Sequence, residues 1–496
     1  MGRIWHASAI LLAITTAFLF PPASPLDSSS VLYGPTPCRA KAGRGYIISF
    51  ARMAAVDDKP FIAFRSWFDD DRFGNGELVI AYPTAALPAG PDDWVLLGAG
   101  EENEVAWNDE GWIGWIDLAE IDGNIGCAFD CGMGSGGLGF CQSASADPGS
   151  QDELVSSLIN AEDHVLGGAC AISSYRGLPI VATCADRHST LRVGWAKSRY
   201  PICQNDWVVQ SVYSCPEDNK AIWDTSLTFA SINDIPAVFF QVGTAYKGTM
   251  FMATPAVAGP QNPSWQITRL FPSMMIYQDK PAVHVANGIV TVLHTNKNKP
   301  SISQCPETFV AHASKWSSTP LLRHKDGRPE AYGFYHGKPL IAFCDFSREP
   351  VGLTLLLADS SVPRSANDWR EFKLDTGSYA EVSLAEVDGK PTVAYFAYDP
   401  DRICYAYATT LNRTVEQDWQ VCTVVEHNLL SWREQYNLSH PNQAEVPDQA
   451  EEAPVDQQTS DQPTSLGFII GLVVLAIFGI ALVLAIVRAG DTEPSE

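Results

Sequence analysis

The chain has 496 residues, a formal net charge of −24 and 12 cysteines. This acidity argues against a general nucleic-acid binder, because such proteins need cationic groups to replace the counterions of the phosphate backbone. It suits a soluble ectodomain, a cation binder or a surface for basic partners. The even number of cysteines is typical of disulfide-bonded extracellular proteins when a secretory signal is present.

The first 24 residues have the pattern of a secretory signal peptide. Arg3 and His6 precede an apolar run over residues 9–20, and prolines and small residues follow it. A positive start, a short apolar centre and small residues define such signals, and the run is too short to cross a bilayer well. We therefore expect residues 1–24 to be removed during export.

A repeat of about 50 residues runs through most of the chain. Each copy contains a two-residue turn, and the Asp-Gly, Asn-Gly and His-Gly pairs among them suit tight hairpins because glycine accepts positive φ cheaply. The turns lie at residues 58, 123, 177, 234, 288, 337 and 389. Six copies also carry a tryptophan 28 to 36 residues after the turn, and Leu154 takes this place in the second copy. These tryptophans are Trp94, Trp207, Trp265, Trp316, Trp369 and Trp419.

Each repeat has room for four short strands. In the last copy they are expected over residues 380–386, 391–397, 403–408 and 419–424. The second strand is apolar at successive positions, which indicates that both of its faces are covered. An alanine recurs in this strand, where we expect close approach of a neighbouring sheet, and the tryptophan is expected to fill the wider gap. The recurring alanines are Ala63, Ala128, Ala182, Ala342 and Ala394.

Four strands in each repeat of this length resemble a β-propeller. The resemblance covers residues 45–426 and implies an all-β fold of seven four-stranded antiparallel blades around one axis. It is a resemblance to the architecture, since kelch, WD-repeat and sialidase Asp-box signatures are not evident. The alternative is two or three β-sandwiches, which would not explain a single period through the whole chain.

The C-terminal region predicts a membrane anchor. Residues 427–465 are polar and acidic, which predicts a solvated stalk. Residues 466–487 carry no charge and as a helix would be about 33 Å long, enough to span a bilayer. Arg488 opens the tail of residues 488–496, so the propeller is expected outside the cytoplasm, at the cell surface or on another membrane of the secretory pathway. The alternative is a cleaved glycolipid-anchor signal.

The cysteines and two asparagines predict covalent modifications. Three cysteine pairs lie symmetrically about expected hairpins: Cys170 with Cys184, Cys404 with Cys422, and Cys131 with Cys141. A zinc site at Cys127, Cys131 and Cys141 is the alternative for the last group, but structural zinc normally takes four ligands and no histidine lies nearby. Asn412 and Asn437 begin N-glycosylation motifs.

No catalytic motif stands out in the sequence. Residues 132–137 match Gly-x-Gly-x-x-Gly, but expected strands flank them on both sides, so they form a hairpin loop rather than a dinucleotide site. We place the candidate site in the loops between the second and third strands of each blade, which share one face of a propeller and are rich in charge here. The candidate ligand-binding residues are Asp69, Asp70, Asp71, Asp130, Asp186, Arg187, His188, Asp345, Arg348, Asp399, Asp401 and Arg402.

These loop carboxylates favour binding over catalysis. They could bind Ca²⁺, which prefers oxygen ligands, although no other cofactor is expected. The first hypothesis is a non-enzymatic adhesion or receptor-like module for an extracellular protein or a glycan. The second is a membrane-tethered hydrolase or lyase that acts on glycans through paired loop carboxylates. The third hypothesis is a structural envelope protein. The simplest interpretation of the charged loops is that they are solvated and bind nothing.

Overall fold

The computed structural model describes most of the chain between Ser30 and Ser431. The described residues are 30–32, 48–67, 76–85, 87–99, 115–130, 137–149, 153–160, 170–185, 189–215, 221–222, 227–244, 247–261, 264–273, 280–296, 299–321, 327–345, 352–376, 378–398, 402–409 and 419–431. The expected signal peptide, membrane span and tail lie outside these residues. Within the described ranges, no helix is long and apolar enough to cross a membrane.

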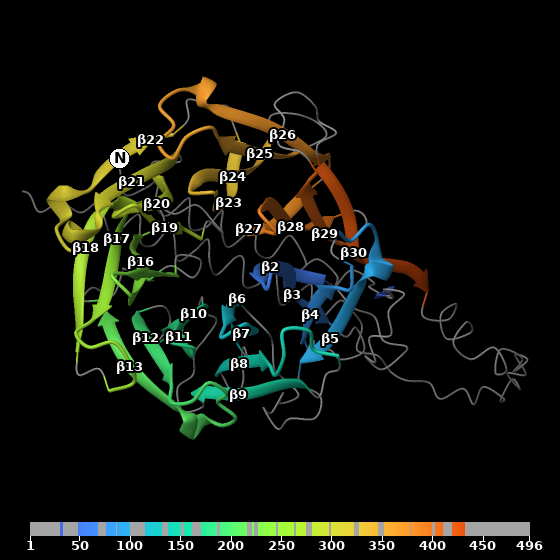
Figure 1. Ribbon diagram of the computed structural model, residues 1–496, viewed down its shortest axis with the longest axis horizontal. Coiled ribbons are helices and arrows are strands. Elements are labelled where there is room, and N and C mark those ends of the chain that lie inside the picture. Colours follow the sequence, from blue (N-terminus) through green and yellow to red (C-terminus); the bar gives the residue numbers. More distant parts are fainter. Residues whose placement is uncertain are drawn as a thin grey trace, which may run out of the picture. The chain divides into compact units, whose positions relative to one another are not determined.

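Seven antiparallel sheets surround a common centre, as the sequence predicts (Figure 1). Each sheet contains four strands in chain order, here called strands A to D from the centre outwards, and two of the sheets have one additional short strand. Blades 1 to 3 consist of β2 (Ile48–Val56), β3 (Lys59–Trp67), β4 (Gly76–Pro83) and β5 (Trp94–Ala99); β6 (Ile116–Ile121), β7 (Asn124–Asp130), β8 (Leu138–Ser143) and β9 (Leu154–Asn160); and β10 (Cys170–Tyr175), β11 (Leu178–Ala185), β12 (Thr190–Ala196) and β13 (Trp207–Ser214).

The remaining four blades follow the same order. They consist of β15 (Thr228–Ile232), β16 (Ile235–Thr244), β17 (Lys247–Pro255) and β18 (Trp265–Ser273); β19 (Ala282–Ala286), β20 (Ile289–Asn296), β21 (Lys299–Pro306) and β22 (Ser317–Pro320); β23 (Gly327–Tyr335), β24 (Lys338–Asp345), β25 (Gly352–Ala358) and β26 (Trp369–Thr376); and β27 (Ser378–Val387), β28 (Lys390–Tyr398), β29 (Arg402–Ala408) and β30 (Trp419–Ser431). In blade 4, β14 (Ala221–Ile222) pairs with the end of β16.

The predicted turns join strands A and B in all seven blades. The last of them places Asp388 at a φ of 49° and Gly389 at 62°, both in the left-handed region. Two consecutive positive φ values match the twist of a tight hairpin, and this explains why aspartate, asparagine and glycine recur at the turns.

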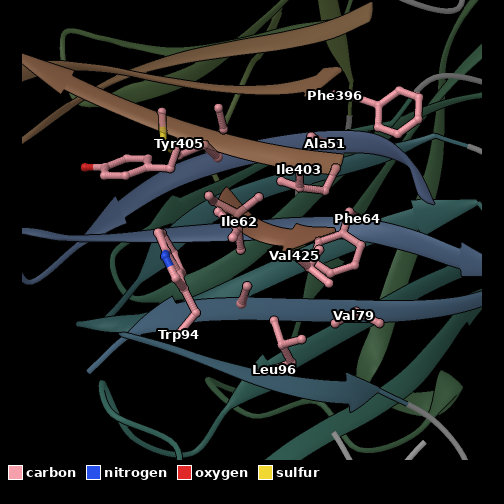
Figure 2. Packing of buried hydrophobic residues seen from close by; sticks show 14 of the residues in the cluster. Ala51, Ile62, Phe64, Val79, Trp94, Leu96, Phe396, Ile403, Tyr405 and Val425 are labelled. Atoms are coloured by element: carbon pink, nitrogen blue, oxygen red, sulfur yellow. The ribbon is translucent and has the colours of Figure 1, made fainter. Parts of the chain in front are cut away.

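The apolar core lies between neighbouring blades, because strand B is covered on both faces. Ile62 and Phe64 of β3 pack against blade 7 (Figure 2). Phe61 and Ala63 of the same strand pack against blade 2. The recurring alanine is fully buried in the five blades where it was expected. A strand buried on both faces needs apolar residues at every position, which is the pattern found in the sequence.

The recurring tryptophan is the first residue of strand D or, for Trp316, the residue directly before it, and it packs on the preceding blade. Trp207 contacts Phe140 of blade 2 edge-to-face at 5.1 Å between ring centroids, and its Nε1 donates a hydrogen bond to Ser157 Oγ at 3.2 Å. The Asp206 that precedes it accepts a backbone hydrogen bond from Ile202 at 2.9 Å. The Asp-Trp pair therefore closes the C–D turn and seals the gap between two blades.

The ring is closed by contacts between blades 7 and 1. The backbone N–H of Met53 in β2 donates a hydrogen bond to Ser383 Oγ in β27 at 3.0 Å. An additional strand, β1 (Ser30–Leu32), pairs with the outer edge of β30, with Val31 opposite Asn428. The strands of the propeller therefore extend on both sides of the expected range of residues 45–426.

The predicted Cys170–Cys184 and Cys404–Cys422 disulfides are wrong, because none of the described cysteines is bonded to another. Cys170 lies opposite Thr183, and Cys404 lies opposite Thr423. Cys184 and Cys422 are each one residue from those positions, so their side chains lie on the opposite face of the sheet from their expected partners. Cys141 is also free, and it lies opposite Cys127, whereas Cys131 is outside the described residues.

Candidate functional site

Most of the predicted loop residues lie outside the described side chains. Asp130 ends β7 with only 1% of its surface exposed, and its N–H donates a hydrogen bond to the Trp115 carbonyl at 2.9 Å. Arg402 begins β29 and is half-buried, and Asp345 is the last residue of β24. Blades 2 and 7, which hold Asp130 and Arg402, are not neighbours. Asp69, Asp70, Asp71, Asp186, Arg187, His188, Arg348, Asp399 and Asp401 lie outside the described residues.

A cavity of about 290 Å³ lies at the centre of the ring. Its walls are formed by strands A of several blades and by the segment that leads into β19. The fifth residue before the first residue of each two-residue A–B turn occupies an equivalent position, and these seven residues are called the axial ring. The axial ring consists of Arg52, Asp117, Ala171, Thr228, Ala282, Ala331 and Ser383, and all except Ala171 line the cavity.

The axial ring also joins neighbouring blades. Asp117 Oδ2 accepts a hydrogen bond from the backbone N–H of Ile172 in the next blade at 3.0 Å. Ser383 and Met53 make the equivalent contact between blades 7 and 1. A polar side chain at this position therefore satisfies a backbone donor of the next blade close to the axis.

An ion pair connects distant parts of the cavity wall. Lys280 Nζ, from the segment before β19 in blade 5, lies 2.5 Å from Asp117 Oδ1 in blade 2. Blades 3 and 4 separate these two residues along the ring. Both oxygens of Asp117 are thus engaged, one by the ammonium group and one by the Ile172 amide.

Arg52 is a second cation at the cavity, and its charge acts on the buried residue Glu381. Glu381 of β27 is 8% exposed and precedes Val382 and Ser383, which line the cavity. Burial raises the pKa of Glu381 to about 7, although the charges of Arg52 and Arg65 act in the opposite direction. Arg65 is also buried, and its burial lowers its pKa while Glu381 raises it. The three residues form a charge cluster between blades 1 and 7.

Glu330 is a second buried carboxyl group at the cavity. It lies at an irregularity in β23, between Pro329 and Ala331, where the register with β24 shifts. Only 2% of its surface is exposed, yet it belongs to the cavity lining. Glu381 occupies a similar irregularity of strand A in the next blade. β-Bulges re-aim side chains in this way near functional sites.

The cavity therefore combines two cations, Arg52 and Lys280, with the carboxyl groups of Asp117 and Glu330. Such a wall can bind a polar molecule with several hydrogen-bonding groups. Over the described part of the chain, no group of three or more His, Cys, Asp or Glu residues is arranged to hold a metal ion. The expected Ca²⁺ site relied mostly on loop carboxylates outside these residues and stays a prediction.

Sequence reasoning missed this site because it considered loops rather than strands. A signal was nevertheless present, since Arg52 and Asp117 both lie five residues before their turns in otherwise apolar strands. A charged residue at a repeated position of an inner strand indicates an axial site. Lys280 gave no such signal, because it precedes its strand and reaches the axis only through the tertiary fold.

Comparisons with known proteins identify the fold alone. No family model and no curated protein matches the chain. Prolyl oligopeptidase B from Galerina marginata, bound to a 25mer macrocyclization substrate, is similar over 79% of this chain and 52% of its own, with a TM-score of 0.50 and 12% identity. The polysaccharide lyase Uly1 is similar over 81% of this chain and 94% of its own, with a TM-score of 0.46 and 11% identity.

The NanB sialidase from Streptococcus pneumoniae is also similar, in a K499G mutant structure. It matches 82% of this chain and 71% of its own, with a TM-score of 0.40 and 10% identity. The chain spans about half the length of the prolyl endopeptidase and oligopeptidases that it matches. At such low identity, these similarities assign no activity to this chain, and the oligopeptidase B structure with a TM-score of 0.50 bears on the fold alone.

Proposed function

We propose that this chain is a membrane-tethered extracellular binding module that takes a small polar molecule into its axial cavity. The observation that supports it is the axial ring, in which two of seven equivalent positions carry charge and face one cavity with Lys280 and Glu330. Buried charge is costly unless it is paired or used, so its concentration at one cavity indicates a ligand site.

The size of the cavity limits the ligand. A volume of about 290 Å³ lies at the lower end of ligand pockets, so a molecule of monosaccharide or amino-acid size fits better than a long chain. Binding at this position would also link several blades at once. The signal peptide expected over residues 1–24 and the apolar segment over residues 466–487 support the proposal of an ectodomain anchored by one helix.

The full chain in detergent tests this function in a thermal-shift screen of small polar compounds. Compounds that bind the cavity should raise the melting temperature of the wild type and leave Ala282→Trp unchanged, because the indole fills the cavity. Ala311→Trp, in an exposed loop of the same blade, is the matched control and should respond like the wild type. Compounds that stabilise Ala282→Trp equally, or a screen without any stabilising compound, would reject the proposal.

Glycan hydrolysis or lysis is a second candidate function. It is favoured by the two buried carboxyl groups, Glu330 and Glu381, at strand irregularities of adjacent blades. A carboxyl group with a pKa of about 7, as for Glu381, can act as a general acid at neutral pH. Release of nitrophenol from aryl glycosides, lost in Glu330→Gln, would support this candidate. Equal release by wild type and variant would contradict it.

A further inference from the structure

We propose that the seam between blades 4 and 5 is an acid-sensitive contact, in which uptake of a proton by the buried His294 loosens β18 from β20. The polar part of this seam consists of His294, Ser273 and Ser303. The seam works without the ligand proposed for the axial cavity, because none of these three residues belongs to the cavity wall.

His294 lies in the apolar core between the two blades. Val290 and Val292 precede it on the same face of β20, and both belong to the core shared with blade 4. Only 1% of the surface of His294 is exposed. The Phe271 ring of β18 packs on the imidazole, with 4.7 Å between the ring centroids. The histidine is therefore a titratable group in a core that is otherwise apolar.

Both nitrogens of the His294 ring have partners within the seam. Nδ1 lies 3.0 Å from Ser273 Oγ of β18 and 3.2 Å from the Thr295 carbonyl oxygen. Nε2 lies 2.8 Å from Ser303 Oγ of β21. Ser273 Oγ also accepts a hydrogen bond from Gln241 Nε2 at 2.8 Å. One imidazole ring thus joins strand D of blade 4 to strands B and C of blade 5.

The groups that contact the ring are neutral. Within the described part of the chain, they are two hydroxyl groups, one carbonyl group and one phenyl ring. Burial lowers the pKa of His294 to about 4, and the hydrogen bond with the Thr295 carbonyl acts in the opposite direction. None of the titratable side chains described on the neighbouring strands or just before β19 is among the causes of this shift. These side chains are Arg269, Lys280, His284, Lys299, Cys305, Glu330 and Tyr332.

A proton on His294 would place a positive charge in this core without a counter-charge. Burial of a charge is costly unless the charge is paired, so the protonated ring favours an open seam in which water reaches it. The proton also has a route to the ring. Ser303 Oγ lies 2.6 Å from Ser318 Oγ, and Ser318 is exposed on β22. Two hydrogen-bonded hydroxyl groups therefore connect the imidazole with the outer edge of blade 5.

Urea unfolding of the full chain in detergent measures the cost of this proton. The unfolded chain protonates the histidine near pH 6.5, whereas the folded protein resists protonation until about pH 4. The stabilisation is therefore complete above pH 6.5 and is lost as the pH falls toward 4. Relative to His294→Gln, which does not titrate, the unfolding equilibrium constant of the wild type should rise roughly 100-fold between pH 7 and pH 4.

Hydrogen exchange at pH 4.5 locates the effect within the ring. The amides of β18 and β20 should exchange roughly tenfold or more faster in the wild type than in His294→Gln, because local opening exposes them. The amides of β29 in blade 7 should exchange equally in both proteins. His312→Gln, at an exposed position of blade 5, is the matched control and should follow the wild type.

Exchange of the imidazole C2 hydrogen, followed by mass spectrometry, measures the titration of His294 in the wild type without any substitution. A midpoint near 4 is expected. A midpoint near 6.5, or parallel unfolding profiles for the wild type and His294→Gln, would overturn the inference. Equal acceleration of amide exchange in all seven blades would also overturn it, because the effect would then not belong to the seam. No ligand enters these measurements, so they leave the proposed binding function to its own test.

Discussion

Glu381 combines a buried carboxyl group with an unfavourable backbone conformation. Its φ is 57°, in the left-handed region that side chains other than asparagine, aspartate and glycine seldom adopt. The irregular register of β27 at this residue places the carboxyl group beside Arg52 and Arg65. Burial of this carboxyl group disfavours its charged form, and this outweighs the opposing effect of the two arginine charges on its pKa.

We expect Glu381 to reduce the stability of the protein as the pH rises. In the unfolded chain the pKa of a glutamate is 4.5, whereas burial raises it to about 7 in the folded protein. Between these values the folded state retains a proton that the unfolded state has released, so the free energy of unfolding decreases as the pH increases. Glu381→Gln, which is neutral at every pH, should lack this decrease.

Urea unfolding between pH 4.5 and pH 7.5 measures the effect. Relative to Glu381→Gln, the wild type should lose up to about 3 kcal/mol over this interval. Glu371→Gln, at an exposed position of β26, is the control and should follow the wild type. Parallel profiles for the wild type and Glu381→Gln would show that the carboxyl group does not hold its proton in the folded state.

At the scale of the element, the D strand and the turn before it form the seal between blades. Asp206 fixes the turn through the amides of Ile202 and Cys203, and these hydrogen bonds lower the pKa of its carboxyl group. The next residue, Trp207, then packs on Phe140 of the preceding blade. In blade 2, Leu154 begins the D strand instead and is equally buried, so the position requires apolar volume rather than an indole ring.

Trp207→Ala should destabilise the propeller by about 3–5 kcal/mol, as large-to-small core substitutions do. Trp207→Leu should cost less, since blade 2 shows that leucine fits at this position. Ile202→Ala, in the same turn but 67% exposed, is the control and should change little. Denaturant unfolding measures all three variants, and equal stability of Trp207→Ala and wild type would contradict the role of this residue as a seal.

At the scale of the whole molecule, closure depends on residues that are far apart in the sequence. Met53 and Ser383 form a hydrogen bond between blades 1 and 7 across 330 residues of chain. The β1 strand contributes a backbone ladder from the N-terminal segment to the outer edge of β30. A ring whose first and last blades are held only by side chains opens more readily, because few contacts oppose the separation of its ends.

Val31→Pro should weaken this closure, because proline cannot donate a ladder hydrogen bond. The amides of β30 near Asn428 should then exchange with deuterium faster, whereas those of β13 in blade 3 should be unchanged. Val31→Thr retains the backbone donor and should exchange like the wild type. Unchanged exchange in the proline variant would mean that β1 does not stabilise the edge of blade 7.

The propeller was predictable because its determinants are local and repeated. The turn at Asp388 and Gly389 requires positive φ, and the apolar B strands reflect burial of both faces. Each repeat therefore predicted the same sheet independently of the others. The tryptophan register likewise marked the start of strand D. The predicted disulfide pairs were wrong by one residue in the register of their strands. A shift by one position along a strand moves a side chain to the other face of its sheet.

The axial cavity and the residues that line it could be identified only from the tertiary structure. Its walls come from blades distributed around the ring, and Lys280 meets Asp117 only because blades 2 and 5 face one axis. The sequence by itself determined the number of blades, the order of their strands and the positions of their turns, since turn geometry and burial act within one repeat. Only the closed ring decided which charges converge, because proximity around an axis is independent of proximity along the chain.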